Sequence, residues 1–260
     1  MRVSLITVCL NAASTIATCL KSVESQTHPD IEHIIVDGGS RDDTVSIVKR
    51  YGNRVSALTS GRDAGIYDAM NRGLKMAQGD MVAYLNADDL YADDRCVQAM
   101  AEAISVSGTD SAFADISYVQ KLAPTERVRC WKSGPFKPGA FARGWAPPHT
   151  AFFAKREALL ELGGFDLRYR LASDFDLMMR AMEIKRLTTT YVPKELVLMR
   201  LGGATNVSLR NVLIQNWEII ESLARAGFPL AAPQLVVQKI LSRAAQRLWA
   251  HQVSRAQRAK

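Results

Sequence analysis

Strand-like and helix-like segments alternate four times within the first 90 residues, which constrains the fold more than any other feature. The β-branched run VSLITV, residues 3–8, has the composition of a strand buried on both faces in a parallel sheet. Further strands are predicted at 32–37, 55–59 and 81–85, with helices at about 15–25, 44–51 and 66–77. This order predicts an α/β fold, with a mostly parallel sheet flanked by helices.

Polar residues cluster where each of these four strands ends. The clusters are residues 7–11, 37–40, 60–63 and 86–89, and three of the four carry a carboxylate. Loops are usually polar, but carboxylates at three of four strand ends are more than that rule requires. In parallel α/β sheets ligands bind beyond the carboxyl ends of the strands, so the sequence predicts one ligand-binding rim.

The rest of the chain is less regular. A hairpin is predicted at 111–118 and 127–131, a strand at 150–154, helices at 156–162 and 173–183, and an extended segment at 187–199 broken by Pro193. Asp42 or Asp43 is expected to cap the helix at 44–51. From residue 208 the pattern is helical. We therefore divide the chain into a main domain, 1–204, and a basic helical extension, 205–260.

Charge is spread unevenly along the 260 residues. The net charge is +7, and the segment 205–260 has eight Lys or Arg and two Glu, a net of +6, which leaves +1 for the body. The four cysteines form no metal-binding or disulfide pattern, and no run of 18 apolar residues exists. These features predict a cytoplasmic protein without a membrane span. They do not favour nucleic acid as a partner, because no nucleic-acid motif occurs and the basic residues are confined to the end of the chain.

Two adjacent carboxylates, Asp88 and Asp89, follow the strand at 81–85, with Asn86 close by. A hard divalent cation needs only one or two protein carboxylates when substrate phosphates and water supply its other ligands. Such a cation would neutralise a diphosphate leaving group. The alternative is that one of these carboxylates caps the next helical turn. The residues by themselves favour neither interpretation.

Two further motifs carry candidate ligand-binding residues. In VDGGS, Asp37 ends a strand, and the two glycines allow a nucleotide to approach the backbone. In SGRDAGIYDAMNRG, Asp63 follows a strand beside Gly65, and we favour a ligand role for it. Asp68, three residues before Asn71, shares a helix face with it, which is typical of a solvated surface as well as of a substrate contact.

Taken together, the motifs resemble the inverting glycosyltransferases of family 2, which have the GT-A fold. The matching pieces lie in family order between residue 3 and about 203: LITVCLNAASTIATCLKSVESQ, IIVDGGSRDDT, SGRDAGIYDAMNRGLKMAQGD, YLNADD and GGFDLRYRLASDFDLMMR. The phrase GIYDAMNRG further resembles the branch that builds bacterial polysaccharides and some glycolipids. The resemblance implies a nucleoside-diphosphate sugar as donor, with UDP favoured, and a divalent cation, Mn²⁺ or Mg²⁺, as cofactor.

The resemblance also implies roles for individual residues. Thr7, Val8 and Asn11 would line the nucleotide, Asp37 would contact its base, and Asp63 would lie near base, ribose and phosphates. NADD stands at the family's DxD motif. Asp88 would bind the metal and Asp89 would support the metal site, while Asn86 replaces the usual first carboxylate. Tyr67, Asp68, Asn86 and His149 are candidate substrate contacts.

Asp174 falls on the family's catalytic carboxylate, with Ser173 in place of the preceding acid. One carboxylate must take the proton of the acceptor hydroxyl as that hydroxyl attacks the anomeric carbon. We favour Asp174 as this base, with Asp176 as the fallback. The alternative from the residues alone is a helix N-cap. For His149, a structural role is the alternative to a contact with donor or acceptor sugar.

The end of the chain has the pattern of an amphipathic basic helix. Lys239, Arg243 and Arg247 recur every four residues, and Leu248 and Trp249 lie on another face. This pattern suits a helix on anionic lipid through 235–260, at the inner face of the cytoplasmic membrane, or equally a solvated surface helix.

The sequence therefore predicts a metal-dependent, inverting glycosyltransferase that acts on a glycan or lipid-linked acceptor in cell-surface polysaccharide or glycolipid synthesis. One rival is a nucleotidyltransferase, which would need basic residues in the loop CLNAAS after the first strand. The other is a catalytically degenerate protein that binds nucleotide sugar or acts as a scaffold in a polysaccharide assembly complex. Asn86 and Ser173 favour this second rival, whereas the intact Asp88 and Asp174 count against it.

Overall fold

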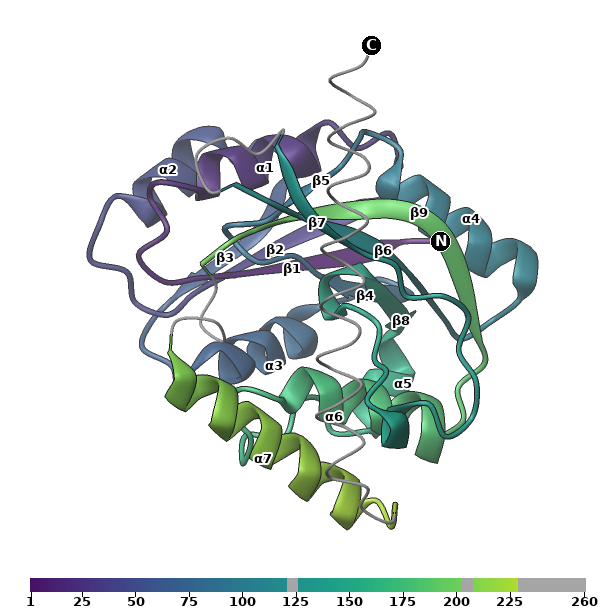
Figure 1. The fold of residues 1–260 in the computed structure, drawn as a ribbon. Helices are drawn as coiled ribbons and strands as arrows, with labels where there is room; N and C mark the ends of the chain where they lie inside the picture. The colour runs from purple at the N-terminus through teal and green to yellow at the C-terminus, as the bar shows by residue number, and fades with distance from the viewer. Residues whose placement is uncertain (121–125, 203–207, 229–260) are drawn as a thin grey trace, which may run out of the picture.

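The computed structural model describes residues 1–120, 126–202 and 208–228 (Figure 1). The strands are β1 (Val3–Cys9), β2 (Ile31–Asp37), β3 (Val55–Ser60), β4 (Met81–Tyr84), β5 (Leu90–Tyr91), β6 (Ser111–Val119), β7 (Arg127–Trp131), β8 (Phe152–Lys155) and β9 (Thr189–Arg200). The helices are α1 (Ile16–Glu24), α2 (Thr44–Tyr51), α3 (Ile66–Met76), α4 (Cys96–Ser107), α5 (Arg156–Glu161), α6 (Ser173–Met179) and α7 (Leu209–Arg225). Three short turns complete them: η1 (Phe141–Arg143), η2 (His149–Ala151) and η3 (Arg180–Ile184).

Strands β1 to β4 form the parallel part of the sheet, as predicted. β1 lies between β2 and β4, and β3 pairs with the other side of β2. Every residue of β1 is buried, which explains why its sequence shows no polar alternation. The register places Cys9 beside Asp37, and Asp37 beside Ser60, so the ends of β1, β2 and β3 meet at one edge.

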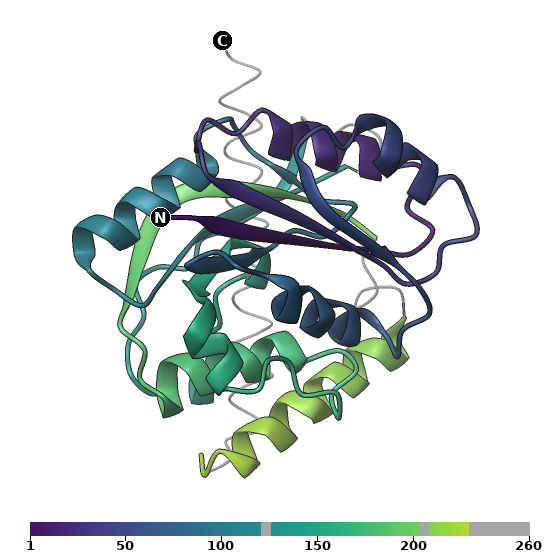
Figure 2. The ribbon, with the colours of Figure 1, turned by 180° about the vertical axis from the view of Figure 1, so that it is seen from behind.

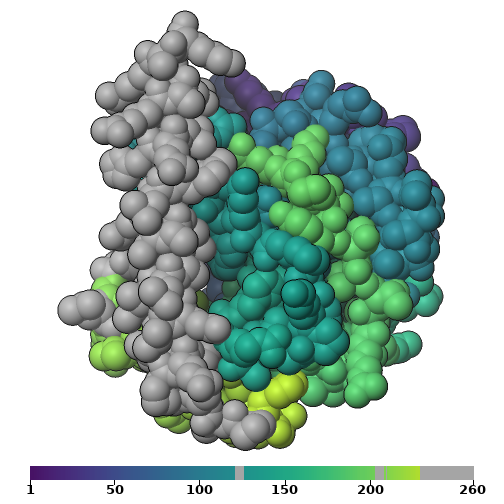
Figure 3. Space-filling model, turned by 45° about the vertical axis from the view of Figure 1, so that its right-hand side comes forward, coloured from purple at the N-terminus to yellow at the C-terminus, as the bar shows by residue number. Residues whose placement is uncertain are grey.

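The other half of the sheet is mixed. β8 pairs antiparallel with β4 and with β6, and β6 forms the predicted hairpin with β7. The long strand β9 runs parallel to β6 and pairs antiparallel with β5. Figure 3 shows β9 in green crossing this face between α4 in blue and the teal residues of β6 and β7. Because β5 directly follows the turn at 86–89, β9 brings a late part of the chain against that turn.

Helices cover both faces of the sheet (Figures 1 and 2). On one face α3, α5, α6 and α7 pack over a large core that includes Met70, Leu159, Phe175 and Ile219. On the other face, α1 and α4 pack over a second core, and α2 packs with α1 on a third, smaller one. Helix α7 belongs to the predicted extension, yet it shares the main core with the body of the protein. Residues 229–260, which include the predicted basic helix, lie outside the described part of the chain.

Four elements differ from the prediction, one of them the short strand β5, which is not among the predicted strands. Helix α4 is not among the predicted elements, although Cys96, Val97, Met100 and Ile104 have helical spacing and are buried. The helix predicted at 173–183 is α6 followed by the π turn η3. The extended segment continues through Pro193, but its pairing with β6 shifts between Val192 and Glu195, because proline has no N–H to donate to a neighbouring strand.

Candidate active site

Three predicted site residues meet in the structure: Tyr67, His149 and Asp174, the Asp174 trio. Tyr67 Oη donates to Asp174 Oδ1 over 3.1 Å, and His149 Nδ1 lies 3.3 Å from Asp174 Oδ2. The N–H of Phe175 donates to Oδ1 over 2.9 Å. The three residues come from α3, η2 and α6, so neither local sequence nor one secondary-structure element fixes their geometry.

Tyr67 and the start of α6 are each held by their own surroundings. Tyr67 stacks on Phe165, with ring centroids 5.3 Å apart. Asn71, one turn later on α3, binds both the N–H and the C=O of Phe165, each over 2.8 Å, which ties α3 to the loop before α6. The start of α6 is fixed by α7, because the Glu218 carboxylate accepts from the N–H groups of Arg170 and Leu171 over 2.9 and 2.7 Å.

The electrostatics of the trio keep Asp174 ionised. Burial raises the pKa of the Asp174 carboxyl. The hydrogen bond and charge of His149 lower this pKa, as do the hydrogen bonds from Phe175 N–H and Tyr67. The net pKa is below the ordinary value. Burial, with the charge of Asp174 as the next cause, raises the pKa of the Tyr67 hydroxyl well above its ordinary value. Tyr67 therefore remains a hydrogen-bond donor at neutral pH.

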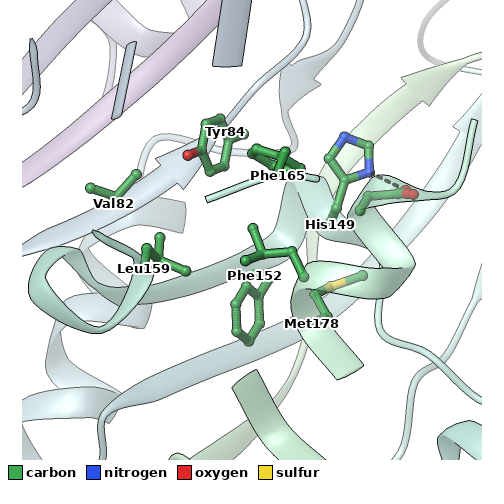
Figure 4. Close-up of a pocket in the computed structure, with 9 residues that line it drawn as sticks. Val82, Tyr84, His149, Phe152, Leu159, Phe165 and Met178 are labelled. Carbon is green, nitrogen blue, oxygen red and sulfur yellow. Dashed lines mark ion pairs between the residues drawn. The ribbon is translucent and has the colours of Figure 1, made fainter. Parts of the chain in front are cut away.

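A small pocket adjoins the trio (Figure 4). Its walls are mainly apolar, and His149 and Asp174 belong to its lining. The other lining residues are Val82, Tyr84, Phe152, Leu159, Phe165, Leu177 and Met178. His149 Nε2 is buried and has no hydrogen-bond partner among the described residues. The imidazole is thus fixed through Nδ1 alone.

Asp176, the fallback base, has a structural role. Its side chain is 7% exposed, against 24% for Asp174. Asp176 Oδ2 accepts from Arg180 over 2.7 Å, and its Oδ1 accepts from Ser222 Oγ of α7 over 2.7 Å. Asp176 therefore joins α6 to α7. Both oxygens of Asp174 are also hydrogen-bonded, but Asp174 is the more exposed of the two carboxylates.

The predicted rim forms around Asp37. Its carboxylate accepts from Ser60 Oγ over 2.6 Å, from Ser40 Oγ, and from the N–H groups of Gly39 and Ser40. Burial raises the pKa of Asp37, but these hydrogen bonds more than offset it and the net pKa is lowered. Asn11 joins the same edge, since its N–H donates to Ser40 Oγ and its Oδ1 accepts from Arg41 N–H. Asp37 therefore shapes the rim from within, being only 1% exposed.

Gly38 and Asp63 fit closely together on this rim. A Cβ at position 38 would lie 2.5 Å from Asp63 Oδ2, closer than atoms can approach. Asp63 Oδ1 accepts from Gly65 N–H over 3.0 Å, so the carboxylate is oriented by its own loop. Asp68, in contrast, is engaged locally, with Ala64 N–H and with Arg72 at 2.9 Å.

Thr7 and Val8 lie inside the sheet. Thr7 is fully buried, and its Oγ1 lies 3.0 Å from Nε2 of the buried His33, whose pKa burial lowers to about 3. Val8 is 6% exposed and packs in the main core. The side chain of Thr7 is therefore committed to the core, and Asn11 is an exposed polar residue at this strand end.

The turn at 86–89 is held by an arginine from the end of β9. Arg200 N–H donates to Asp89 Oδ1 over 3.1 Å, and its guanidinium donates to the Asp88 carbonyl and to Thr18 Oγ1. Asn86 Nδ2 donates to Asp89 Oδ2 over 3.2 Å. Burial and the charge of Asp88 raise the pKa of the Asp89 carboxyl well above its ordinary value. Asp89 is thus an internal support, whereas the adjacent Asp88 is half-buried.

The donors at this turn fit a divalent cation that a substrate helps to bind. No group of three or more His, Cys, Asp or Glu in the described ranges could hold a metal alone. Asn86 Oδ1, however, is buried without a hydrogen-bond partner among the described residues, and Asn86 lies two residues before Asp88 in the same turn. An amide oxygen and a carboxylate are hard ligands that suit Mg²⁺ or Mn²⁺ when phosphate oxygens and water complete the shell.

Sequence reasoning missed two relationships. The sequence gives no signal for Arg200, which lies 111 residues from Asp89 with no motif around it. For His149 the sequence predicts a sugar contact, but its polar partner in the structure is Asp174. The order of the motifs assigns each residue a position in the family pattern, but it does not indicate which side chains contact one another.

The mostly parallel sheet with polar residues at its strand ends, and the part-exposed Asp174 carboxylate on α6, are the features expected of the GT-A fold. Residues 4–157, more than half of the chain, match the model of glycosyl transferase family 2. The chain belongs to this family.

Relatives and solved structures agree with this assignment. The chain is 29% identical over 245 residues to a PGL/p-HBAD biosynthesis glycosyltransferase of Mycobacterium bovis, covering 85% of this chain and 93% of the relative. It resembles the mannosyltransferase PcManGT from Pyrobaculum calidifontis in complex with GDP-Man and Mn²⁺, with TM-score 0.66, 20% identity, and coverage of 99% and 79%. It also resembles S. aureus TarS 1-349 in complex with UDP, with TM-score 0.64, 18% identity, and coverage of 86% and 65%. These likenesses confirm the GT-A fold.

Within the described residues, no helix is both long enough and apolar enough to span a bilayer.

Proposed function

We propose that this protein transfers a sugar, with inversion, from a UDP-sugar to a hydroxyl of a glycan or lipid-linked acceptor in the synthesis of cell-surface polysaccharide or glycolipid. The observation that carries the proposal is the Asp174 trio, because it provides a part-exposed, ionised carboxylate beside the polar rim. The relative's role in PGL/p-HBAD biosynthesis supports an acceptor of this kind.

The donor would bind along the rim. Asn11, Asp63 and the backbone at Gly38 and Gly39 would line the nucleotide, with Asp37 fixing the shape of the loop from behind. UDP is favoured because S. aureus TarS binds it. PcManGT, however, binds GDP-Man, so the identity of the nucleobase has to be tested directly.

Asp88, with Asn86 Oδ1, would hold the divalent cation together with the diphosphate. When bound, the cation supplies positive charge that stabilises the diphosphate as its bond to the sugar breaks. Asp89 and Arg200 keep the turn in place, since the Arg200 N–H and guanidinium bind both sides of it. The first carboxylate of the usual motif is absent, so this chain would depend on substrate phosphates for much of the coordination.

Asp174 would accept the proton of the acceptor hydroxyl. As the hydroxyl oxygen forms its bond to the anomeric carbon, the bond from that carbon to the diphosphate breaks, and the nucleoside diphosphate leaves from the opposite face. His149 and Tyr67 hold the carboxylate by one hydrogen bond to each oxygen, which keeps it ionised and oriented for the proton transfer.

Titration calorimetry of UDP and GDP, with and without Mn²⁺, on the wild type and on Asp88→Asn tests this proposal. We expect UDP to bind with Mn²⁺ and to lose the Mn²⁺-dependent part of its affinity in the variant. Preference for GDP would show that the donor is a GDP-sugar instead of a UDP-sugar. Absence of binding by both nucleotides in the wild type would reject a UDP- or GDP-sugar transferase and favour the scaffold function. Binding equal in both proteins would reject Asp88 as a metal ligand.

A further inference from the structure

Helix α7 exposes two large apolar side chains one turn apart. Leu213 is 71% exposed and Trp217 is 63% exposed, whereas Ile219 and Leu223 on the other side of the helix are buried in the main core. Exposing tryptophan and leucine to water is unfavourable, and neighbouring exposed apolar residues commonly mark an interaction site.

The loop before α6 adds to this surface. Arg170 N–H donates to Glu218 of α7, so the loop lies against the helix, and it carries the exposed residues Leu167, Arg168 and Arg170. Arg210 is exposed in the first turn of α7. We call these six residues the α7 surface: Leu167, Arg168, Arg170, Arg210, Leu213 and Trp217. In Figures 1 and 2, α7 lies at the outer margin of the molecule.

The charge of the α7 surface is positive. Glu218 is buried and accepts from two backbone N–H groups, Glu221 pairs with Arg225, and Asp166 pairs with Arg168. No described carboxylate forms an ion pair with Arg170 or Arg210. Apolar side chains with a tryptophan among arginines are typical of a surface that inserts into the interface of an anionic bilayer.

A second copy of the chain suits this surface less well. In a two-fold dimer the same patch meets itself, which would place the arginines of one copy near those of the other. Lipid phosphates have the opposite charge and can pair with Arg170 and Arg210, which form no ion pair with a described carboxylate.

The α7 surface is rigidly connected to the proposed catalytic base. Glu218, next to Trp217, binds the backbone at Arg170 and Leu171, just before α6. One turn later, Ser222 Oγ donates to the buried Asp176, two residues after Asp174. These bonds fix α7 to the start of α6, so a membrane that binds α7 would lie at a fixed position relative to Asp174.

We propose that the α7 surface binds the anionic surface of a membrane through Leu213 and Trp217, and thereby presents Asp174 to acceptors anchored there. The inference about the acceptor rests on the proposed function, whereas the lipid contact does not. The lipid contact of the α7 surface is also distinct from the membrane contact predicted for residues 235–260, because it uses described side chains of α7 and the adjoining loop.

The test uses the full-length chain and vesicles of phosphatidylcholine with or without phosphatidylglycerol. In sedimentation with the anionic vesicles, Leu213→Gln/Trp217→Gln should bind about tenfold more weakly than the wild type. Val106→Gln is the matched control, since Val106 is 89% exposed on α4, and it should bind like the wild type. Trp217→Leu keeps an apolar side chain, so it should still bind but show less quenching of tryptophan fluorescence by brominated phosphatidylglycerol.

Equal vesicle binding by the wild type and the double variant, or quenching unchanged in Trp217→Leu, would overturn the proposal and assign any lipid contact to another segment. A change from dimer to monomer in the double variant without lipid would assign the surface to a second copy. UDP titration with Mn²⁺ on the same proteins separates the two proposals. A double variant that loses vesicle binding but keeps UDP binding shows that the change affects only the lipid contact of α7. A wild type that binds vesicles but not UDP contradicts the proposed function and leaves the lipid contact standing.

Discussion

His149 Nδ1 lies 3.3 Å from Asp174 Oδ2, while Tyr67 Oη donates to the other oxygen of the same carboxylate. Two side chains from separate elements therefore hold Asp174 on opposite sides. This arrangement limits the rotation of the carboxylate and keeps it charged beside an apolar pocket.

Asp174→Asn should abolish most of the sugar transfer and leave donor binding intact. The amide preserves the shape of the side chain but cannot accept the proton, and loss of a general base typically costs about 10²- to 10⁴-fold in rate. The measurement is kcat together with UDP affinity by calorimetry. Glu161→Gln, which alters a carboxylate 64% exposed on α5, is the control and should retain full activity. Near-normal turnover in Asp174→Asn would remove the residue from the mechanism.

His149→Ala should move the acidic limb of the pH–kcat profile to higher pH. His149 provides the largest effects that lower the pKa of Asp174, and burial, which raises it, remains in the variant. Because the base must be ionised, a higher pKa means that activity is lost at a higher pH as the solution is acidified. His149→Asn keeps a donor and should shift the limb less. An acidic limb that stays in place in both variants would show that His149 does not tune Asp174.

Gly38→Ala should weaken UDP binding by about 10- to 100-fold, the effect of losing a hydrogen bond from a charged group. The added methyl group would displace the Asp63 carboxylate, since its Cβ would lie 2.5 Å from Oδ2. Calorimetry on Gly38→Ala, Asp63→Ala and the double variant measures the coupling. If Gly38→Ala acts by displacing an Asp63 carboxylate that binds the donor, the double variant should lose less binding free energy than the sum of the two single variants. Unchanged affinity in both single variants would argue that this part of the rim does not contact the nucleotide.

Arg200→Leu should lower the free energy of unfolding by about 1–3 kcal/mol, the usual cost of leaving buried polar groups without partners. The change removes the guanidinium from the Asp88 carbonyl and from Thr18 Oγ1, while the backbone bond to Asp89 remains. Urea unfolding measures the loss. Arg50→Leu, at an exposed position on α2, is the comparison and should have little effect. Equal stability of the two variants would contradict a supporting role for Arg200 at the 86–89 turn.

Much of the first half of the fold was predictable because its signals are local. Buried parallel strands are continuous apolar runs, and the helices between them repeat their apolar residues at helical spacing, so the chain order indicates the sheet. Helix α4 was missed even though its apolar spacing is present. The mixed half of the sheet was less predictable, because the position of β8 between β4 and β6 depends on pairing between distant segments.

The candidate site, too, has one part that local sequence predicts and another that depends on contacts between distant segments. Motifs identified Asp37, Asp63, Asp88 and Asp174 one by one, since each occurs in a short, ordered pattern. They did not separate exposed from buried members of a motif: Asp88 is half-buried and Asp89 is internal, although the two are adjacent. Side-chain direction depends on the surrounding packing, and β9 delivers the arginine that holds Asp89.

The sequence by itself determined the α/β class, the family and the chemical groups available, because periodicity and motif order are properties of neighbouring residues. Only the tertiary structure decided which groups act together. Tyr67 and Asp174 are 107 residues apart in the chain but within hydrogen-bond distance, and α7 is joined to Asp174 through α6. Contacts of this kind arise from packing of the whole core, whose many small interactions no single stretch of sequence contains.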